Sequence, residues 1–295
     1  MADARKPLEP PVTGKRARLT ERASLVRAHA DEARARHSSL DFGARLVERD
    51  SAIGGGLLAG ALAYRLFVLL LPTTLLLVSG LGLYAGTVDE SPSKVVKEAG
   101  LHGLFASEVS ASASGRHRGL VFLLMVPAVL YAMVALYRAI AKVHAIAWHG
   151  SGRRAGITRR GVAVFAGALL LQVVALQIVG WVRRNDQVGG LAALIVYLVL
   201  ASGAWLAVST QLPHRDVRWP RLLPGALLFG VGLLFVNIFN IYVTTRLVEN
   251  RADTYGALGI ATALLFSLVL VGRLIVVSAE LNASLSETRA PEAVA

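Results

Sequence analysis

The residues best placed to do chemistry are charged side chains inside long apolar segments. Two arginines, Arg65 and Arg273, interrupt runs of otherwise apolar residues. Because a guanidinium at the centre of a bilayer costs about 2.5 kcal/mol or more, each should face protein, water or a ligand rather than lipid tails. Guanidinium groups bind phosphate with bidentate geometry. We therefore expect such a cation to be able to meet the phosphate of a lipid headgroup.

Amide side chains add polar groups to other apolar segments. Asn237 and Asn240 are three residues apart, so they share one face of a helix. Gln172 and Gln177 lie in an earlier apolar run. Buried amides either form hydrogen bonds across membrane helices or line a polar pathway, and the sequence leaves both interpretations open.

The candidate substrate-pathway residues are two arginines, four amides, a tyrosine next to the first arginine and a carboxylate near the end of the last apolar run: Arg65, Arg273, Asn237, Asn240, Gln172, Gln177, Tyr64 and Glu280. Glu280 follows Arg273 by seven residues, too far for a local pair, so we expect it to meet a basic group on another helix or near the cytoplasmic surface. In the alternative interpretation, these charges are buried structural ties.

Two prolines lie within apolar runs and are candidate bending points. Pro72 follows Arg65 by seven residues, and Pro127 interrupts the second apolar run. Proline removes a backbone donor and kinks a helix at that point. We expect both to serve as points of bending between conformations, although simple packing geometry would also explain them.

No group of residues predicts a catalytic centre. The chain has no cysteine, which excludes thiol catalysis and cysteine-ligated zinc. A metal-dependent nuclease needs clustered carboxylates or histidines, and the seven histidines are scattered along the chain. No nucleotide-binding loop is present. We predict no enzyme activity, no catalytic residue, no cofactor and no metal site.

Composition indicates a polytopic membrane protein. The 295 residues are 55% hydrophobic, which is unusual for a soluble protein of this length. The net charge of +12 fits cytoplasmic loops rich in lysine and arginine better than it fits nucleic-acid binding, which we do not predict. Residues 138–160 carry six lysine and arginine residues and no acidic residue, which predicts a cytoplasmic loop.

Six apolar runs are long enough to cross a hydrocarbon core, which takes about 20 helical residues. The predicted spans are residues 53–83, 119–141, 161–182, 189–211, 222–245 and 255–281. They predict an all-α membrane domain over residues 39–283, with both termini in the cytoplasm. We expect residues 1–38 to form a polar, largely disordered cytoplasmic tail and residues 284–295 to form a short cytoplasmic tail.

Five short motifs occur in order along residues 40–285, and their order and the six-span layout resemble the YihY/BrkB family of bacterial inner-membrane proteins, once mislabelled as ribonuclease BN. The motifs are Ala61–Arg65 followed by Pro72, Leu136–Ala139, Pro224–Ala226, Tyr255–Gly259 and Ala279–Ala283. The chain departs from the family pattern at Ala141, where an asparagine is common, and at residues 68–71, which lack the usual serine.

The resemblance implies an inner-membrane protein of the cell envelope, since members have been linked to serum resistance and to lipid or lipopolysaccharide export. We predict a lipid transporter or flippase that moves a phospholipid or lipid-linked glycan. The alternative is a structural membrane scaffold that supports envelope integrity. The expected partners are membrane lipids, a second copy of the chain, or other envelope-transport proteins.

Overall fold

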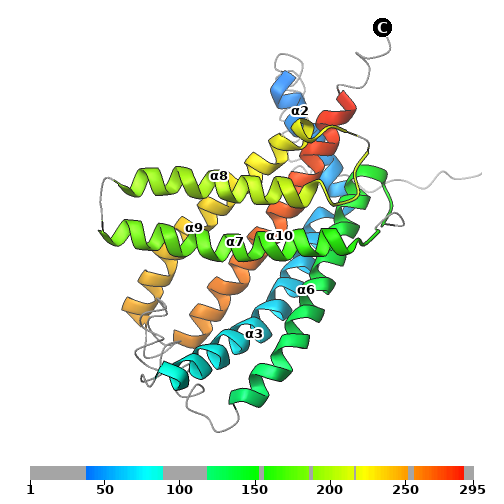
Figure 1. Cartoon of the computed structure of the whole chain (residues 1–295). Helices are drawn as coiled ribbons and strands as arrows, with labels where there is room; N and C mark the ends of the chain where they lie inside the picture. Colours follow the sequence, from blue (N-terminus) through cyan, green and yellow to red (C-terminus); the bar gives the residue numbers. More distant parts are fainter. Residues whose placement is uncertain are drawn as a thin grey trace, which may run out of the picture. The chain divides into compact units, whose positions relative to one another are not determined.

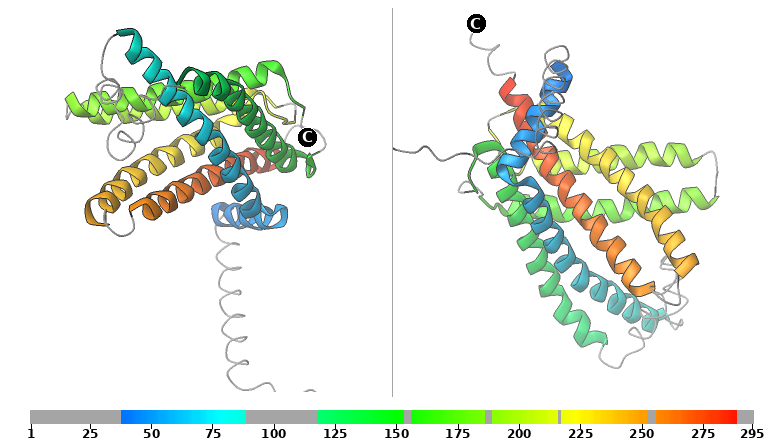
Figure 2. Two further views of the ribbon diagram at one scale, coloured as in Figure 1. Left: turned by 90° about the horizontal axis from the view of Figure 1, so that it is seen from below. Right: turned by 180° about the vertical axis from the view of Figure 1, so that it is seen from behind.

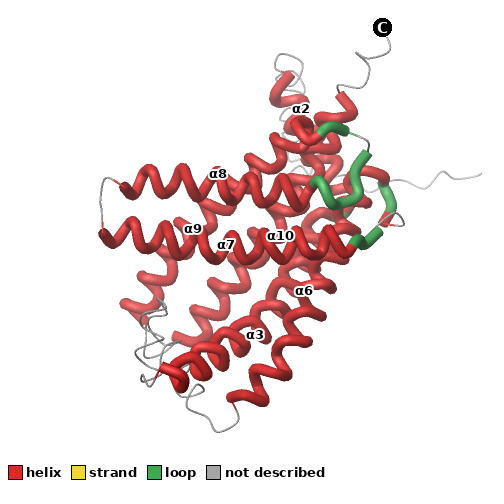
Figure 3. The backbone as a smooth tube through the Cα atoms, in the orientation of Figure 1, coloured by secondary structure: helices red, strands yellow, loops and turns green. Residues whose placement is uncertain are grey.

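The computed structural model describes residues 38–88, 118–152, 156–185, 189–215, 217–251 and 256–288. These residues form seven α-helices and no strand (Figures 1 and 3): α2 (Ser38–Ile53), α3 (Gly55–Val88), α6 (Arg118–His149), α7 (Arg159–Asn185), α8 (Gly189–Ser209), α9 (Leu223–Arg251) and α10 (Gly256–Thr288). A 3-10 turn, η2 (Trp219–Leu222), precedes α9. Every helix except α2 contains a stretch long and apolar enough to cross a membrane. The prediction of an all-α, six-span membrane protein is confirmed.

The chain divides into two compact units, Met1–Arg49 and Asp50–Ala295. We call the second one the membrane unit. Predictions that fall on residues 1–37, 89–117 and 289–295 lie outside the described residues. The cytoplasmic placement of both termini stays a prediction.

Within the membrane unit, each helix lies beside a small set of neighbours. Helix α3 contacts α6 and α10, and α9 contacts α8 and α10. Helices α7 and α8 form an antiparallel hairpin that lies across the directions of α3 and α6 (Figures 1 and 2). This arrangement leaves α3 and α6 as a pair at one side of the unit.

The six long helices pack most closely at the end where α3, α7 and α9 begin and where α6, α8 and α10 end. The buried residues of α6 all lie between Ala132 and Trp148, whereas its first half exposes apolar side chains such as Leu123. Among the described side chains of α10, from Thr262 onward, the first buried one is Ser267. Toward the other end the α7–α8 hairpin diverges from α3 and α6 (Figure 2), and the many exposed apolar side chains there suit contact with lipid tails.

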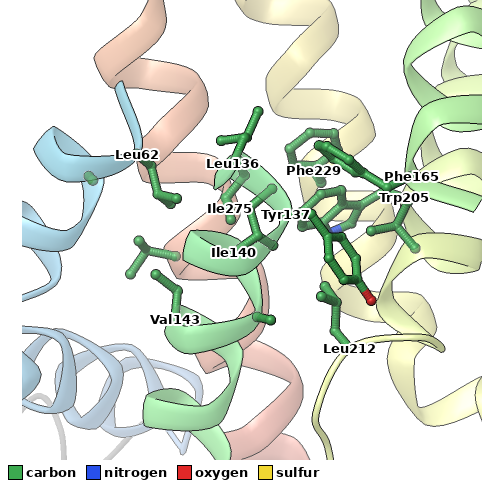
Figure 4. Close-up of a cluster of buried hydrophobic side chains, with 14 of the residues drawn as sticks. Leu62, Leu136, Tyr137, Ile140, Val143, Phe165, Trp205, Leu212, Phe229 and Ile275 are labelled. Carbon is green, nitrogen blue, oxygen red and sulfur yellow. The ribbon is translucent and has the colours of Figure 1, made fainter. Parts of the chain in front are cut away.

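One hydrophobic core at the packed end joins all six long helices. Figure 4 shows its main side chains. Each long helix contributes at least one of them: Leu62, Tyr137, Phe165, Trp205, Phe229 and Ile275. The ring of Trp205 stacks on Phe229 with centroids 4.2 Å apart, and its indole N–H donates a hydrogen bond of 3.1 Å to the Ser278 hydroxyl. The polar edge of this large ring is therefore satisfied inside the core.

Helix α6 extends beyond the span predicted at residues 119–141 and continues to His149. The extension is helical because its inner face is largely apolar: Val143, Ala147 and Trp148 are buried. The helix ends at Gly150, which has a φ of +68° and donates its N–H to the carbonyl oxygen of Ile146 over 2.8 Å. The first part of the predicted 138–160 loop is thus helix, and its cations lie on a helix surface.

A bidentate ion pair ties the end of α2 to α10. Arg273 donates from Nη1 to Asp50 Oδ1 over 2.7 Å and from Nη2 to Asp50 Oδ2 over 2.5 Å. Gly54, with a φ of +69°, separates α2 from α3, and a Cβ on Gly55 would lie 1.8 Å from Asp50 Oδ1. The two glycines therefore let the carboxylate fold back against the start of α3.

We predict that Asp50 and Arg273 stabilise the fold as a pair. Removing either charge, as in Asp50→Asn or Arg273→Gln, should lower the free energy of unfolding by about 1.5–3 kcal/mol, because hydrogen bonds to a charged group are lost. The double variant should lose clearly less than the sum of the two single losses. Thermal unfolding in detergent measures the stability loss of the two single variants and of the double variant. Strictly additive losses would contradict the pairing.

Candidate functional site

A pocket of about 750 Å³ lies between α3 and α6 in the membrane unit. Its lining comes from these two helices and from the segment before α7: Ala61, Arg65, Leu130, Tyr131, Val134, Ala135, Arg138, Ala139, Lys142 and Ile157. We call it the cationic pocket, because three of these side chains are positively charged and none is acidic.

The helical repeat brings the charges together. On α6, Arg138 and Lys142 are four residues apart, so they lie on one face, opposite the buried Tyr137 and Ile140. On α3, Ala61 and Arg65 have the same spacing. The small side chains of the alanines in the lining leave the space that the pocket occupies.

The three cations lie at similar distances from the packed end. Arg65 is ten residues into α3, or about 15 Å, while Arg138 and Lys142 are about 16 and 10 Å from the end of α6 at His149. Leu130 lies about 28 Å from that end. The pocket is therefore cationic toward the packed end and apolar farther along α6.

None of the three cations is neutralised by a carboxylate within the described ranges. Ion pairs among the described residues include Arg45 with Asp41, Arg215 with Glu287, and Arg273 with Asp50. The side chains of Arg65, Arg138 and Lys142 are all exposed on the protein surface. A cluster of three cations on a membrane-spanning surface is unfavourable unless an anion joins it.

Such a pocket has the chemistry of a site for an anionic amphiphile. Guanidinium and ammonium groups bind phosphate oxygens, and the apolar lining formed by residues such as Leu130 and Val134 accommodates hydrocarbon. Basic pockets between membrane helices are known sites for lipid headgroups. Its volume is within the range typical of ligand-binding pockets.

Arg65 is the one predicted pathway residue that lines this pocket, and the other arginine, Arg273, is paired with Asp50. Tyr64, next to Arg65, is 64% exposed but is not part of the lining. Glu280 is completely buried in α10.

The predicted amides also lie outside the pocket. Gln172 donates to the Tyr197 hydroxyl between α7 and α8, and the Ser267 hydroxyl donates to Asn240 between α10 and α9. Asn237 is half-buried and Gln177 is exposed. Gln172 and Asn240 therefore connect neighbouring helices, as expected if the amides form hydrogen bonds across membrane helices rather than line a polar pathway.

The two prolines lie inside continuous helices, Pro72 in α3 and Pro127 in α6. Their role as bending points stays a prediction.

Sequence reasoning did not select Arg138 and Lys142 as site residues because both were counted in the basic 138–160 segment, although the predicted span 119–141 includes Arg138. The signal that could have placed them is the absence of glycine or proline between Ala128 and His149, together with apolar residues at helical spacing up to Trp148. Extending the helix by two turns puts both cations on the face that also carries Tyr131 and Val134.

The sequence model of the family described as Virulence factor BrkB matches residues 47–295. The chain belongs to this family. No curated protein and no solved structure matches it. The BrkB family is not known for enzymatic activity, and among the described residues no group of three histidine, aspartate or glutamate side chains could hold a metal ion.

Two pairs of BrkB-like motifs meet in the fold. Arg65 and Arg138, from the first and second motifs, line the same pocket. Asn282, from the last motif, accepts a hydrogen bond from the Gly225 N–H over 2.8 Å and donates one to the Leu222 carbonyl oxygen over 3.1 Å. One pair of motifs therefore forms the candidate site, and the other fixes the start of α9 against α10.

We predict that the pocket has a strongly positive electrostatic potential, which a reporter cysteine at its rim can measure. The chain has no native cysteine, and Ile157 is exposed and lines the pocket. In an Ile157→Cys variant, the ratio of the anionic to the cationic methanethiosulfonate reaction rate should be about three- to tenfold higher than the same ratio for a free thiol in solution.

Adding Arg138→Gln to the Ile157→Cys variant should sharply reduce this preference for the anionic reagent. Adding Arg218→Gln, which removes an exposed cation outside the pocket, should leave it nearly unchanged. Equal effects of the two substitutions would show that the potential comes from the whole basic surface.

Proposed function

We propose that this BrkB-family protein moves an anionic lipid between the leaflets of the bacterial inner membrane, and that the cationic pocket receives the lipid headgroup. The observation that carries the proposal is the cluster of Arg65, Arg138 and Lys142 on membrane-spanning helices, without a carboxylate in the pocket lining. A headgroup phosphate would supply the missing negative charge at the depth where it is most needed.

The position of the pocket supports movement of a headgroup into the membrane. Lys142 is nearest the end of α6, and Arg138 and Arg65 lie about 5–6 Å farther from the packed end. A headgroup entering from that end would therefore meet Lys142 first and the two guanidinium groups next, while its acyl chains remain beside the apolar part of the pocket.

The exposed cations support a cytoplasmic placement of the packed end. Arg159, Arg160, Arg218 and Arg221 are all exposed in segments that begin or connect helices there. Lysine and arginine are enriched in cytoplasmic loops. The pocket would then take lipid from the cytoplasmic leaflet, with energy from a gradient or a partner protein, because no nucleotide-binding loop is evident in the sequence.

A structural scaffold is the second candidate function, and a specific observation favours it. Arg273, Gln172 and Asn240 have partners on neighbouring segments and therefore need no substrate to explain them. These contacts stabilise the helix arrangement but leave the cationic pocket without a structural explanation. We therefore favour transport.

Lipid movement in proteoliposomes tests the proposal. Fluorescent phosphatidate should exchange between leaflets faster with the protein than in protein-free liposomes. Arg65→Gln, Arg138→Gln and Lys142→Gln should each slow exchange by about tenfold or more, since each removes a charge-assisted contact to phosphate. Arg218→Gln is the matched control and should retain the rate.

Each variant must first show an unfolding temperature close to that of the unmodified protein, which separates loss of transport from loss of folding. Unchanged exchange in the three folded pocket variants would remove the pocket from the mechanism. Absence of exchange by the unmodified protein with several anionic lipids would favour the scaffold.

A further inference from the structure

We infer that the cationic pocket selects lipids whose headgroup carries at least two negative charges and no ammonium group. Phosphatidate and cardiolipin have this chemistry, whereas phosphatidylglycerol carries one charge and phosphatidylethanolamine is zwitterionic. The inference rests on the proposed function only in taking the occupant to be a lipid.

The first argument is charge balance. The described residues of the lining include three cations, Arg65, Arg138 and Lys142, and no acidic side chain. One phosphodiester would neutralise a single cation and leave the other two repelling each other in surroundings of low dielectric constant. A phosphomonoester carries about −1.5 to −2 near neutral pH, and two linked phosphodiesters carry −2, so either balances the cluster far better.

The second argument concerns the headgroup amine. An ammonium group beside the phosphate would need an acceptor or an anion close to the three cations. Apart from the cations, the only polar side chain among the described lining residues is the phenol of Tyr131. An ammonium ion would therefore meet like charges, which is the kind of repulsion that excludes wrong ligands.

The third argument concerns the donors. Two guanidinium groups and one ammonium group approach the pocket from two different helices, Arg65 from α3 and Arg138 with Lys142 from α6. Each guanidinium can bind two oxygens, so the set suits a group with several terminal oxygens, as in a phosphomonoester or a pair of phosphates. A single phosphodiester has only two terminal oxygens and cannot use all these donors.

The apolar part of the pocket identifies the occupant as a lipid rather than free phosphate. Leu130, Val134 and Ala135 line the part away from the cations. An inorganic phosphate ion would leave this surface in contact with water, whereas the first methylene groups of an acyl chain would cover it.

Native mass spectrometry of the purified full chain tests this selectivity. The protein in detergent is titrated with phosphatidate, cardiolipin, phosphatidylglycerol or phosphatidylethanolamine of the same acyl composition. We expect phosphatidate and cardiolipin to bind at least about fivefold more tightly than phosphatidylglycerol, and phosphatidylethanolamine to bind weakest. Millimolar inorganic phosphate should not displace phosphatidate.

Variants separate the pocket from the rest of the basic surface. Arg138→Gln and Lys142→Gln should each reduce the preference for phosphatidate over phosphatidylglycerol to less than about twofold. Arg138→Lys, which keeps the charge, should retain most of the preference, and the control Arg218→Gln should retain all of it. Retention by Arg138→Lys shows that the glutamine variant lost charge rather than fold.

Equal binding of phosphatidate and phosphatidylglycerol by the unmodified protein would overturn the inference. So would an unchanged preference in both glutamine variants, or displacement of phosphatidate by inorganic phosphate. The proposed function is tested separately. Selective binding without lipid movement in proteoliposomes would contradict transport but support the selectivity. Lipid movement with no headgroup preference would support transport but contradict the selectivity.

Discussion

A cation on a membrane-spanning helix must be neutralised, hydrated or bound to an anion, and this constraint organises the membrane unit. Arg273 meets it through two hydrogen bonds to Asp50, a pair that also joins the end of α2 to α10. Arg65 meets no such carboxylate in the described part of the chain and instead shares a pocket with Arg138 and Lys142. The same type of residue is therefore structural at one position and available for a ligand at the other.

The remaining polar groups sharpen this contrast. Trp205, Gln172, Asn240 and Asn282 all take part in hydrogen bonds that join different helices or the turn before α9. These bonds, with the core shared by all six long helices, explain why one end of the unit packs closely. The cationic pocket lies beside this closely packed end, so the helices that carry its charges are held in position before a ligand arrives. Such preorganisation lowers the cost of binding.

Sequence reasoning was strongest where a single run of residues carries the information. The six apolar runs predicted six spans because length and hydropathy alone decide whether a helix can cross a bilayer. The same reasoning identified Arg65 but could not tell it from Arg273, because a partner 223 residues away in the chain, Asp50, leaves no local pattern. Arg138 and Lys142 were missed because a basic segment near the end of an apolar run is typical of a loop. Only the fold shows that they face Arg65.

Photo-crosslinking tests most directly whether the pocket between α3 and α6 holds an anionic lipid. A phosphatidate with a photoreactive group near the phosphate is incorporated with the protein into nanodiscs, irradiated, and the adducts are located by mass spectrometry. We predict adducts concentrated in residues 61–65 and 130–142 that are lost in Arg138→Gln and kept in Arg218→Gln. Adducts spread evenly over other exposed apolar surfaces, such as Leu170 and Val173 of α7, would contradict the account.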